Sequence, residues 1–342
     1  MKITMRDVAA KTGVSLATVS NALNERGGVS DSVKERILAV AREMGYRQEK
    51  EAASPTTHVR LIVYRAHGTF VNENPFFMEM IEGMQSECRK NGVDLTISLV
   101  KAGETDDFED QLRAFRQEKC EGFIVLATEM TPEALKRFKG FRSPLVALDN
   151  AFPHEDVHAV VMDNRQAGAL AARALVEAGC KSFGYITSSM PLQNDDERRA
   201  GFREGLAECG YSLTEAEIWP VSPYQNDKYG DMLRLIDARG KLPDAFFAAN
   251  DGLAVGCMRA IIDAGYSVPG DVSVIGMDDT EICEVCTPQL TTLRVFRREM
   301  GICAARILLS LAVETPPAIR AVVGVRLIRR GSVRYRSGAD RP

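Results

Sequence analysis

From residue 59 onward, short apolar runs alternate with amphipathic segments of helix length. RLIVY is followed by FFMEMIEGMQSECRKNG, then by DLTISLV, DDFEDQLRAFRQEK and GFIVLA. Such alternation is typical of βαβ units, in which crossover helices join parallel strands. The pattern begins again after Asp163 with NRQAGALAARALVEAG, SFGYIT, DERRAGFREGLAECG, DAFFAAND and DVSVIGMDD. The sequence therefore predicts an α/β core of two lobes with parallel sheets over residues 59–335.

The first 47 residues follow a different, purely helical pattern. Thr4 has the spacing of a residue that caps a helix, and Gly13 suits the left-handed turn that would end this helix. Ser15 and Ser30 would cap a second and a third helix. Three short helices with a glycine turn between the first two describe a helix-turn-helix domain. The same pattern would also suit a small helical cap on a larger domain.

Charge separates these two parts of the chain. The formal net charge of the 342 residues is −4, but residues 1–50 carry nine Lys/Arg and six Asp/Glu. Residues 1–50, which include the helical head, thus have a net charge of +3, and the remainder of the chain has a net charge of −7. A basic head suits a phosphate backbone, whereas an acidic body discourages unspecific binding to nucleic acid.

Composition points to a globular protein in a reducing compartment. The chain is 45% apolar and 26% charged, and it has no apolar run of the length that a membrane helix needs. Its N-terminus does not resemble a signal peptide. The eight cysteines lie mostly inside apolar segments, which fits reduced thiols better than disulfides. We therefore expect a cytoplasmic protein without membrane contact.

The head carries a resemblance to a known family. The string DVAAKTGVSLATVSNALN, followed by VSDSVKERILAVAREMGY, closely resembles the N-terminal domain of LacI/GalR-family bacterial transcription regulators. The resemblance implies that the second helix enters the major groove of DNA. Leu16, Ala17 and Asn21 would face bases there and suit adenine edges and thymine methyl groups. The implied DNA-binding set is Thr4, Ser15, Leu16, Ala17, Thr18, Ser20, Asn21, Asn24, Val29 and Ser30, of which the hydroxyl residues and Asn24 would mostly meet phosphates.

The linker, residues 48–58, departs from the family pattern. It is several residues short, and Pro55 stands about where the family has a leucine that wedges into the minor groove. A proline disfavours helical geometry at Ser54, so at most a turn or two of helix can precede it. We expect a flexible tether and therefore looser coupling between the DNA-binding head and the core.

The core is similar to the periplasmic-binding-protein-like domain of the same family. The similar segments are NPFF at 74–77, LDN at 148–150, MDNRQAG at 162–168, RRAGF at 198–202, AANDGLAVG at 248–256, GMDD at 276–279 and PQLTTL at 288–293. The resemblance implies lobe 1 at about 59–161 and 292–322, and lobe 2 at about 162–291 and 323–335. It further implies a small effector, a sugar or sugar derivative, bound between the lobes at the carboxyl ends of the strands.

Four polar residues match positions that hold ligand hydroxyls in this family: Asp149, Arg198, Asn250 and Asp278. Their chemistry agrees, because carboxylates accept pairs of hydroxyl hydrogen bonds and a guanidinium offers a planar set of donors. Asn250 and Asp278 could instead cap a following helix. A merely structural Arg198 would pair with a local carboxylate such as Asp195 or Asp196.

Three aromatic residues complete the implied ligand site. Of Phe76 and Phe77, one is expected to face the ligand and the other the core. Trp219 lies near a segment that supplies an aromatic wall in the family, but a place in the core suits it nearly as well.

The chain has no GxGxxG, GxxxxGK[ST] or GxSxG motif, so we expect no enzymatic activity and neither cofactor nor metal. Cys283 and Cys286 form a CxxC, which could be a redox pair or half of a metal site. The favoured interpretation is a repressor that binds an operator in double-stranded DNA as a homodimer, without the leucine heptads of a tetramer. The alternative is a small-molecule-binding sensor or enzyme-like protein with a vestigial DNA-binding head.

Overall fold

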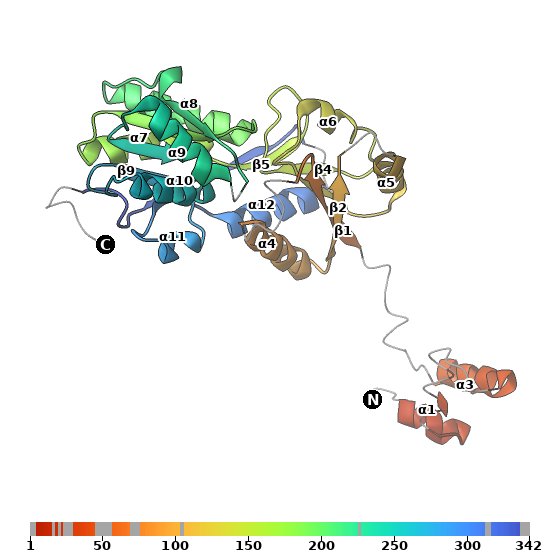
Figure 1. The fold of residues 1–342 in the computed structure, drawn as a ribbon. Coiled ribbons are helices and arrows are strands. Elements are labelled where there is room, and N and C mark those ends of the chain that lie inside the picture. The colour runs from red at the N-terminus through yellow and green to blue at the C-terminus, as the bar shows by residue number, and fades with distance from the viewer. Residues whose placement is uncertain are drawn as a thin grey trace. The chain divides into compact units, whose positions relative to one another are not determined.

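The computed structural model divides the chain into two compact units, Met1–Thr57 and His58–Pro342. It describes residues 5–15, 18–19, 22, 30–44, 57–68, 76–102, 106–224, 227–311 and 316–335. The predicted linker falls almost entirely outside these ranges. Figure 1 shows the helices and strands of each unit.

The N-terminal unit contains helices α1 (Met5–Thr12) and α3 (Asp31–Glu43). Gly13 follows α1 with a φ of 69°, which confirms the predicted left-handed turn. The Ser15 hydroxyl accepts the backbone N–H of Thr18 at 3.1 Å, as predicted for the cap of the second helix. A small apolar core holds the helices together and consists of Val8, Ala9, Val19, Ala22, Ile37 and Ala41. Val40 of α3 is only half-buried and lies outside this core.

The first sheet of the second unit has six parallel strands in the order β11-β5-β4-β3-β1-β2. Its strands are β1 (His58–Arg65), β2 (Asp94–Lys101), β3 (Gly122–Leu126), β4 (Leu145–Leu148), β5 (His158–Met162) and β11 (Arg320–Val323). The pairing of β1 with β3 runs from Val59 opposite Gly122 to Val63 opposite Leu126. Because both faces of β3 are covered, all five of its residues are buried, as expected of a central parallel strand.

The second sheet has the order β12-β10-β9-β8-β6-β7. Its strands are β6 (Phe183–Ser188), β7 (Ile218–Val221), β8 (Ala245–Ala248), β9 (Ser273–Asp278), β10 (Thr291–Val295) and β12 (Val325–Ile328). All pairs are parallel except β10 with β12. The predicted architecture of two parallel-sheet lobes is thus confirmed, with one antiparallel edge strand that the sequence pattern did not indicate.

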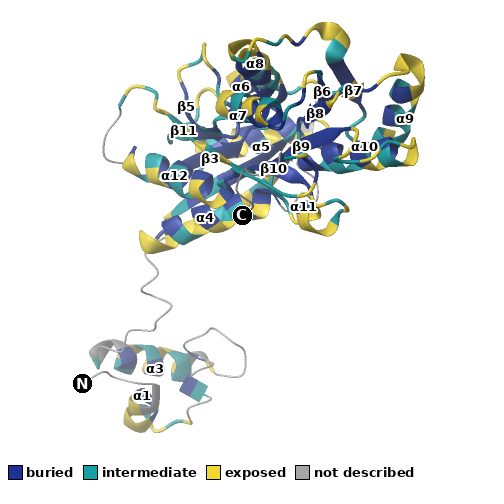
Figure 2. Ribbon diagram, turned by 90° about the vertical axis from the view of Figure 1, so that its left-hand side faces the viewer, coloured by how far each residue is buried: buried dark blue, intermediate teal, exposed yellow. Residues whose placement is uncertain are grey.

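Helices cover both faces of each sheet, so that the strands are buried and the outer helix faces are exposed (Figure 2). The first lobe has α4 (Phe76–Lys90), α5 (Asp106–Gln117), α6 (Pro132–Lys136) and α12 (Arg297–Ser310). The second has α7 (Asn164–Glu177), α8 (Gln193–Glu208), α9 (Asp227–Arg239), α10 (Asp251–Asp263), α11 (Ile282–Val285) and the short 3₁₀ helix η1 (Glu215–Glu217). None of the helices in the described ranges has the length and apolar character that a bilayer crossing requires.

Two helix pairs pack with their backbones in direct contact. In the first lobe, a Cβ on Gly301 of α12 would clash with the carbonyl oxygen of Met80 in α4, and one on Gly83 would clash with that of Arg298. In the second lobe, Gly201 of α8 faces the backbone of α7 in the same way. Because only glycine leaves room for such an approach, these pairs depend on glycine at these positions.

The chain crosses between the lobes three times, from β5 to α7, from β10 to α12 and from β11 to β12. The first two crossings agree with a change of lobe near 162 and before α12. The predicted boundary at 292 is a few residues too early, because β10 pairs with β9 and β12 and therefore belongs to the second sheet. Local sequence pattern cannot show which sheet a strand joins, since that choice depends on its neighbours in space.

Candidate functional site

The strand ends of the two lobes bring four of the predicted ligand residues to one region. Asp149 directly follows β4, Asn250 lies two residues beyond β8, and Asp278 ends β9. Arg198 extends from α8, and its positive charge favours the ionised form of both Asp149 and Asp278. We call Asp149, Arg198, Asn250 and Asp278 the interlobe site.

Asp149 is the buried acid that the first lobe contributes. Only 2% of its surface is exposed, and its backbone has a φ of 69°, in the left-handed region that non-glycine residues rarely adopt. Its carboxylate accepts the Thr128 hydroxyl at 2.6 Å and the side-chain amide of Asn194 at 3.2 Å. Burial raises the pKa of Asp149 to about 6, although these hydrogen bonds and Arg198 oppose the shift.

Arg198 is buried, and each of its three guanidinium nitrogens contacts another group of the protein. Its Nε donates to Asn164 Oδ1 at 2.7 Å, its Nη1 donates to the carbonyl oxygen of Ala249, and its Nη2 lies 3.3 Å from the sulfur of Met162. Neither Asp195 nor Asp196, the partners predicted for a structural arginine, forms a hydrogen bond with it. Arg198 therefore has a structural role through partners that local sequence spacing did not indicate.

The two predicted partners of Arg198 have other contacts. Asp195 accepts the hydroxyls of Tyr185 at 2.5 Å and of Thr187 at 2.6 Å, whereas Asp196 pairs with Arg199 at 2.8 Å. Strand β6 thus supplies the hydroxyl donors of Asp195, and α8 itself supplies the donor of Asp196.

Asp278 and its neighbour Asp279 have unusual backbone conformations. Their φ angles are 119° and 57°, both positive. Burial raises the pKa of Asp278 well above its usual value; Arg198 and Arg297 oppose this, and Asp251 and Asp149 reinforce it. Among the described residues, the side chain of Asp278 makes no capping hydrogen bond to the start of a helix. Strained backbone of this kind is common at functional sites.

Asn250 has the structural role that the sequence left open. Its Oδ1 accepts the backbone N–H of Leu253 at 2.8 Å and so caps α10. Its amide nitrogen can still donate to a ligand, and its Oδ1 keeps a second lone pair. Its role in ligand binding stays a prediction.

The three predicted aromatic residues are all buried. Phe76 and Phe77 pack edge to face, with ring centroids 5.1 Å apart. Trp219 is 2% exposed and packs between Phe246, at 5.0 Å, and the guanidinium of Arg239, at 4.3 Å. Trp219 is therefore a core residue of the second sheet and does not form a wall of the interlobe site.

Two asparagines of the site were missed from the sequence. Asn194 donates to both the carbonyl and the carboxylate of Asp149, across the lobes, and Asn164 donates to Asn194 at 3.2 Å. Asn194 precedes Arg198 by four residues on α8 and so shares its helix face. That spacing was the signal that could have revealed it.

Neither of two candidate motifs brings a set of metal ligands together in the described part of the chain. Cys283 and Cys286 are free, and burial raises the pKa of both thiols, Cys283 strongly. Residues 154–158 read HExxH, a motif overlooked in the sequence, but zinc binding needs both histidines on one helix. Here they lie in a turn and at the start of β5, and Glu155 faces Lys136 and Lys139. The described residues include no group of three potential ligands able to hold a metal.

On the DNA-binding head, the structure describes Ser15, Thr18 and Ser30 of the predicted contact residues. Ser15 and Ser30 are exposed and Thr18 is half-buried. The remaining predicted contacts, Thr4, Leu16, Ala17, Ser20, Asn21, Asn24 and Val29, lie outside the residues whose side chains are described.

Comparison with known proteins identifies the class of protein that this head and core define. Residues 4–49 match the family described as bacterial regulatory proteins, lacI family, and residues 172–333 match the periplasmic binding protein-like domain. The chain belongs to the LacI family, and it is a DNA-binding transcriptional repressor with a ligand-binding core.

Its relatives include the HTH-type transcriptional repressor PurR of Pectobacterium carotovorum, 30% identical over 90% of this chain and 89% of the relative. The ribose operon repressor of Haemophilus influenzae is 28% identical over 91% and 90% of the two chains. Among solved structures, a LacI family transcriptional regulator from Enterococcus faecium with bound ribose has a TM-score of 0.67 and 25% sequence identity. The match covers 80% of this chain and 98% of that regulator.

Proposed function

We propose that the repressor binds its operator as a homodimer and changes its operator affinity when a small polar ligand, a sugar, binds at the interlobe site. It acts in the cytoplasm, where bacterial DNA lies, and catalyses no reaction. The observation that carries the proposal is the hydrogen bonding of Asn194 to Asp149 across the lobes, beside the guanidinium of Arg198. A ligand bound there would touch both lobes and could alter the angle between them.

The chemistry of the interlobe site favours a hydroxyl-rich ligand. Carboxylates accept from pairs of hydroxyls, and the amide of Asn250 and the guanidinium of Arg198 donate to them. Two relatives point the same way, since one is a ribose operon repressor and another was solved with ribose. The names of the PurR relatives give no such indication, so a test of effectors should include compounds other than sugars.

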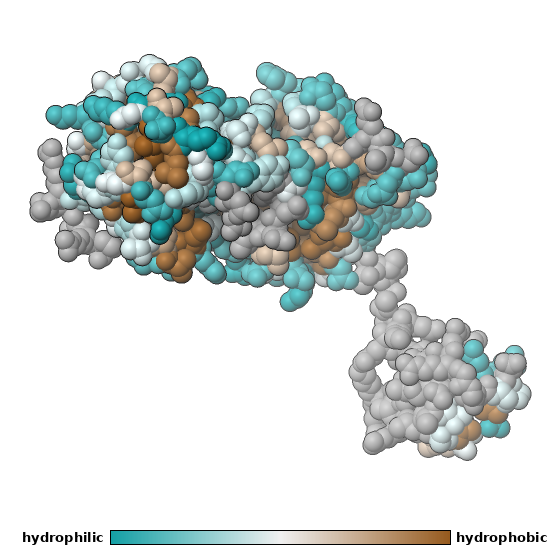
Figure 3. All heavy atoms as spheres, viewed as in Figure 1, coloured by the Kyte–Doolittle hydropathy of each residue, from teal (hydrophilic) through white to brown (hydrophobic). Residues whose placement is uncertain are grey.

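Exposed apolar residues of both lobes support dimer formation. Ile97 and Leu99 project from the edge strand β2, and Met78 lies on α4. In the second lobe Ile282 and Val285 are exposed on α11, Val285 by 78%. Figure 3 shows apolar surface near β2 and near α11. Isolated exposed apolar residues are normal, but residues of both lobes on one face suit the interface of a dimer.

The operator contact rests on the head. Asn21→Ala should change sequence preference at one position of the operator, because losing a good base contact costs about 1 to 3 kcal/mol. Uniform weakening on all sequences would instead make Asn21 a phosphate contact. Selection of bound fragments from a random DNA library measures this preference directly.

The decisive experiment combines DNA binding with a ligand panel. Genomic fragments bound by the full-length protein are selected, and their affinity is then measured with pentoses, hexoses, disaccharides and nucleobases. We expect one sugar to change operator affinity in the wild type and not in Asp149→Ala, with the exposed-site variant Asp156→Ala as control. Absence of any specific fragment would favour the alternative of a vestigial head. If only a nucleobase changed operator affinity, the proposal of a ligand-responsive repressor would stand, but the proposal that its ligand is a sugar would be refuted.

A further inference from the structure

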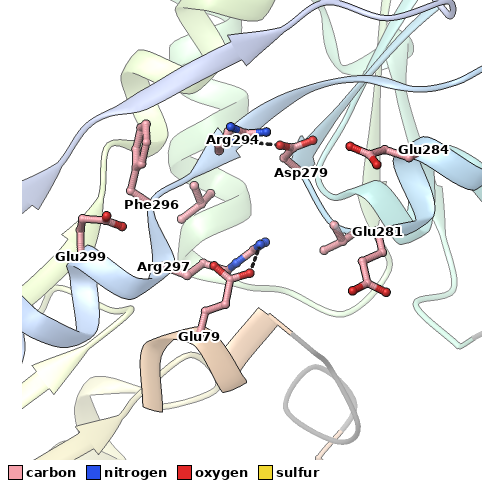
Figure 4. Close-up of a pocket in the computed structure, with 10 residues that line it drawn as sticks. Glu79, Asp279, Glu281, Glu284, Arg294, Phe296, Arg297 and Glu299 are labelled. Carbon is pink, nitrogen blue, oxygen red and sulfur yellow. Dashed lines mark hydrogen bonds and ion pairs between the residues drawn. The ribbon is translucent and has the colours of Figure 1, made fainter. Parts of the chain in front are cut away.

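Arg297 connects the two lobes at one end of the interlobe site. It is the first residue of α12, directly after the chain crosses from β10 into the first lobe. Its Nη1 donates to the carbonyl oxygen of Asp278 at 2.9 Å, in the second lobe. Its Nη2 forms an ion pair with Glu79 of α4, in the first lobe (Figure 4). One buried guanidinium thus binds the end of β9 to the beginning of α4.

Besides these two contacts, the guanidinium of Arg297 lies over one aromatic ring. Its guanidinium lies 5.4 Å from the centroid of the Phe76 ring, and its Nε is buried without a hydrogen-bond partner. A pocket of about 430 Å³, lined by residues of both lobes, opens beside it. Because one side of the group is open, close packing alone does not hold it in place.

The segment that Arg297 holds is the strained one. The positive φ angles of Asp278 and Asp279 are adopted only when surrounding contacts enforce them. Arg294 binds the carboxylate of Asp279 at 2.5 Å, and Arg330 binds it at 2.7 Å. Of these three arginines, Arg297 is the one that forms an ion pair with a described residue of the first lobe, Glu79.

We propose that Arg297 is a positioning residue that fixes Asp278 in its orientation and makes that orientation depend on the angle between the lobes. Arg297 and Glu79 both belong to the first lobe, so their ion pair survives a rotation about the three crossings. The Arg297 contact with the Asp278 carbonyl joins different lobes and must lengthen. Opening of the lobes therefore releases Asp278, and fixing Asp278 opposes opening. The regulatory use of this contact rests on the function proposed above, but the contact itself does not.

Hydrogen–deuterium exchange of the full-length protein, without operator or effector, tests the proposal. The peptide 276–281 contains the amide of Thr280, which donates to Asp251 at 2.9 Å. Arg297→Met should raise exchange in this peptide about tenfold or more, because a hydrogen bond from a charged donor is lost. Arg297→Lys should restore part of the protection. Arg298→Met, an exposed neighbour on the same helix, is the matched control and should change nothing.

Glu79→Gln separates a contact between lobes from a local one. Glu79 is partly exposed, so the variant should fold even if Arg297→Met does not. We expect faster exchange in peptide 276–281 of Glu79→Gln, although this substitution lies in the other lobe. Adding Glu79→Gln to Arg297→Met should not increase the exchange further. Wild-type exchange in Glu79→Gln, or an equal increase in Arg298→Met, would overturn the proposal. Because neither DNA nor a sugar is used, such a failure would leave the proposed repressor function standing.

Discussion

Replacing Asp149 by asparagine should make the protein more stable at neutral pH. The carboxyl group is buried, and its pKa is about 6 instead of 3.8. Each pKa unit corresponds to about 1.4 kcal/mol, so ionisation of Asp149 costs the fold about 3 kcal/mol. Asparagine has nearly the same shape, carries no charge, and can still accept the Thr128 hydroxyl.

The pH dependence fixes the sign of this prediction. Below pH 3.8 the carboxyl is protonated in both the folded and the unfolded chain, and burial carries no ionisation cost. As the pH rises from 3.8 to about 6, the unfolded chain loses the proton first, so the folded state becomes progressively less stable. Above pH 6 the carboxyl is ionised in both states, and the loss of stability reaches its full value. The gain in stability of Asp149→Asn over the wild type should therefore be largest above pH 6 and should shrink toward pH 4.

Thermal unfolding between pH 5 and 8 measures this difference. For a domain of this size, about 3 kcal/mol corresponds to a rise in Tm of about 5 °C or more. Asp156→Asn, at an exposed position, is the control and should follow the wild type at each pH. A variant no more stable at pH 7.5, or a difference that does not change with pH, would show that Arg198 and the hydrogen bonds stabilise the ionised carboxylate in full.

Three further outcomes follow from the packing of the core. Arg198→Ala leaves the carbonyl of Ala249 without its charged donor and should lower the free energy of unfolding in urea by at least about 3 kcal/mol; wild-type stability would refute its structural role. Gly301→Ala should lower stability by about 1–3 kcal/mol or more through overpacking, whereas Gly230→Ala, with the nearest atom at 3.8 Å, should be neutral or slightly stabilising in the same assay. Cys283 should react with iodoacetamide at pH 8 far more slowly in the folded than in the unfolded protein, because burial raises its pKa; equal rates would contradict this.

The architecture could be predicted because it depends on local periodicity. Apolar runs bounded by amphipathic segments predict parallel strands, and strand ends in such sheets gather at one edge. That reasoning predicts the sheet edge at which Asp149 and Asp278 lie. The family resemblance, and not the periodicity, singled out these two residues and Arg198 as ligand contacts.

The errors concern contacts between segments far apart in the sequence. Nothing near Trp219 in the chain indicates that Phe246 and Arg239 enclose it. The assignment of β10 to the second sheet depends on β9 and β12, and the partners of Arg198 come from α7 and from the end of β8. Periodicity shows which face of an element is buried, but it does not show which element covers that face.

The glycine contacts between α4 and α12, and between α7 and α8, also bear on how this protein can be engineered. Because the touching surfaces are backbone, the spacing of each pair does not depend on the shape of any side chain. Exposed positions on these four helices can therefore be varied without moving the strand ends that carry the interlobe site. A library designed to change ligand preference should keep Gly83, Gly168, Gly201 and Gly301 fixed and place its diversity at the strand ends.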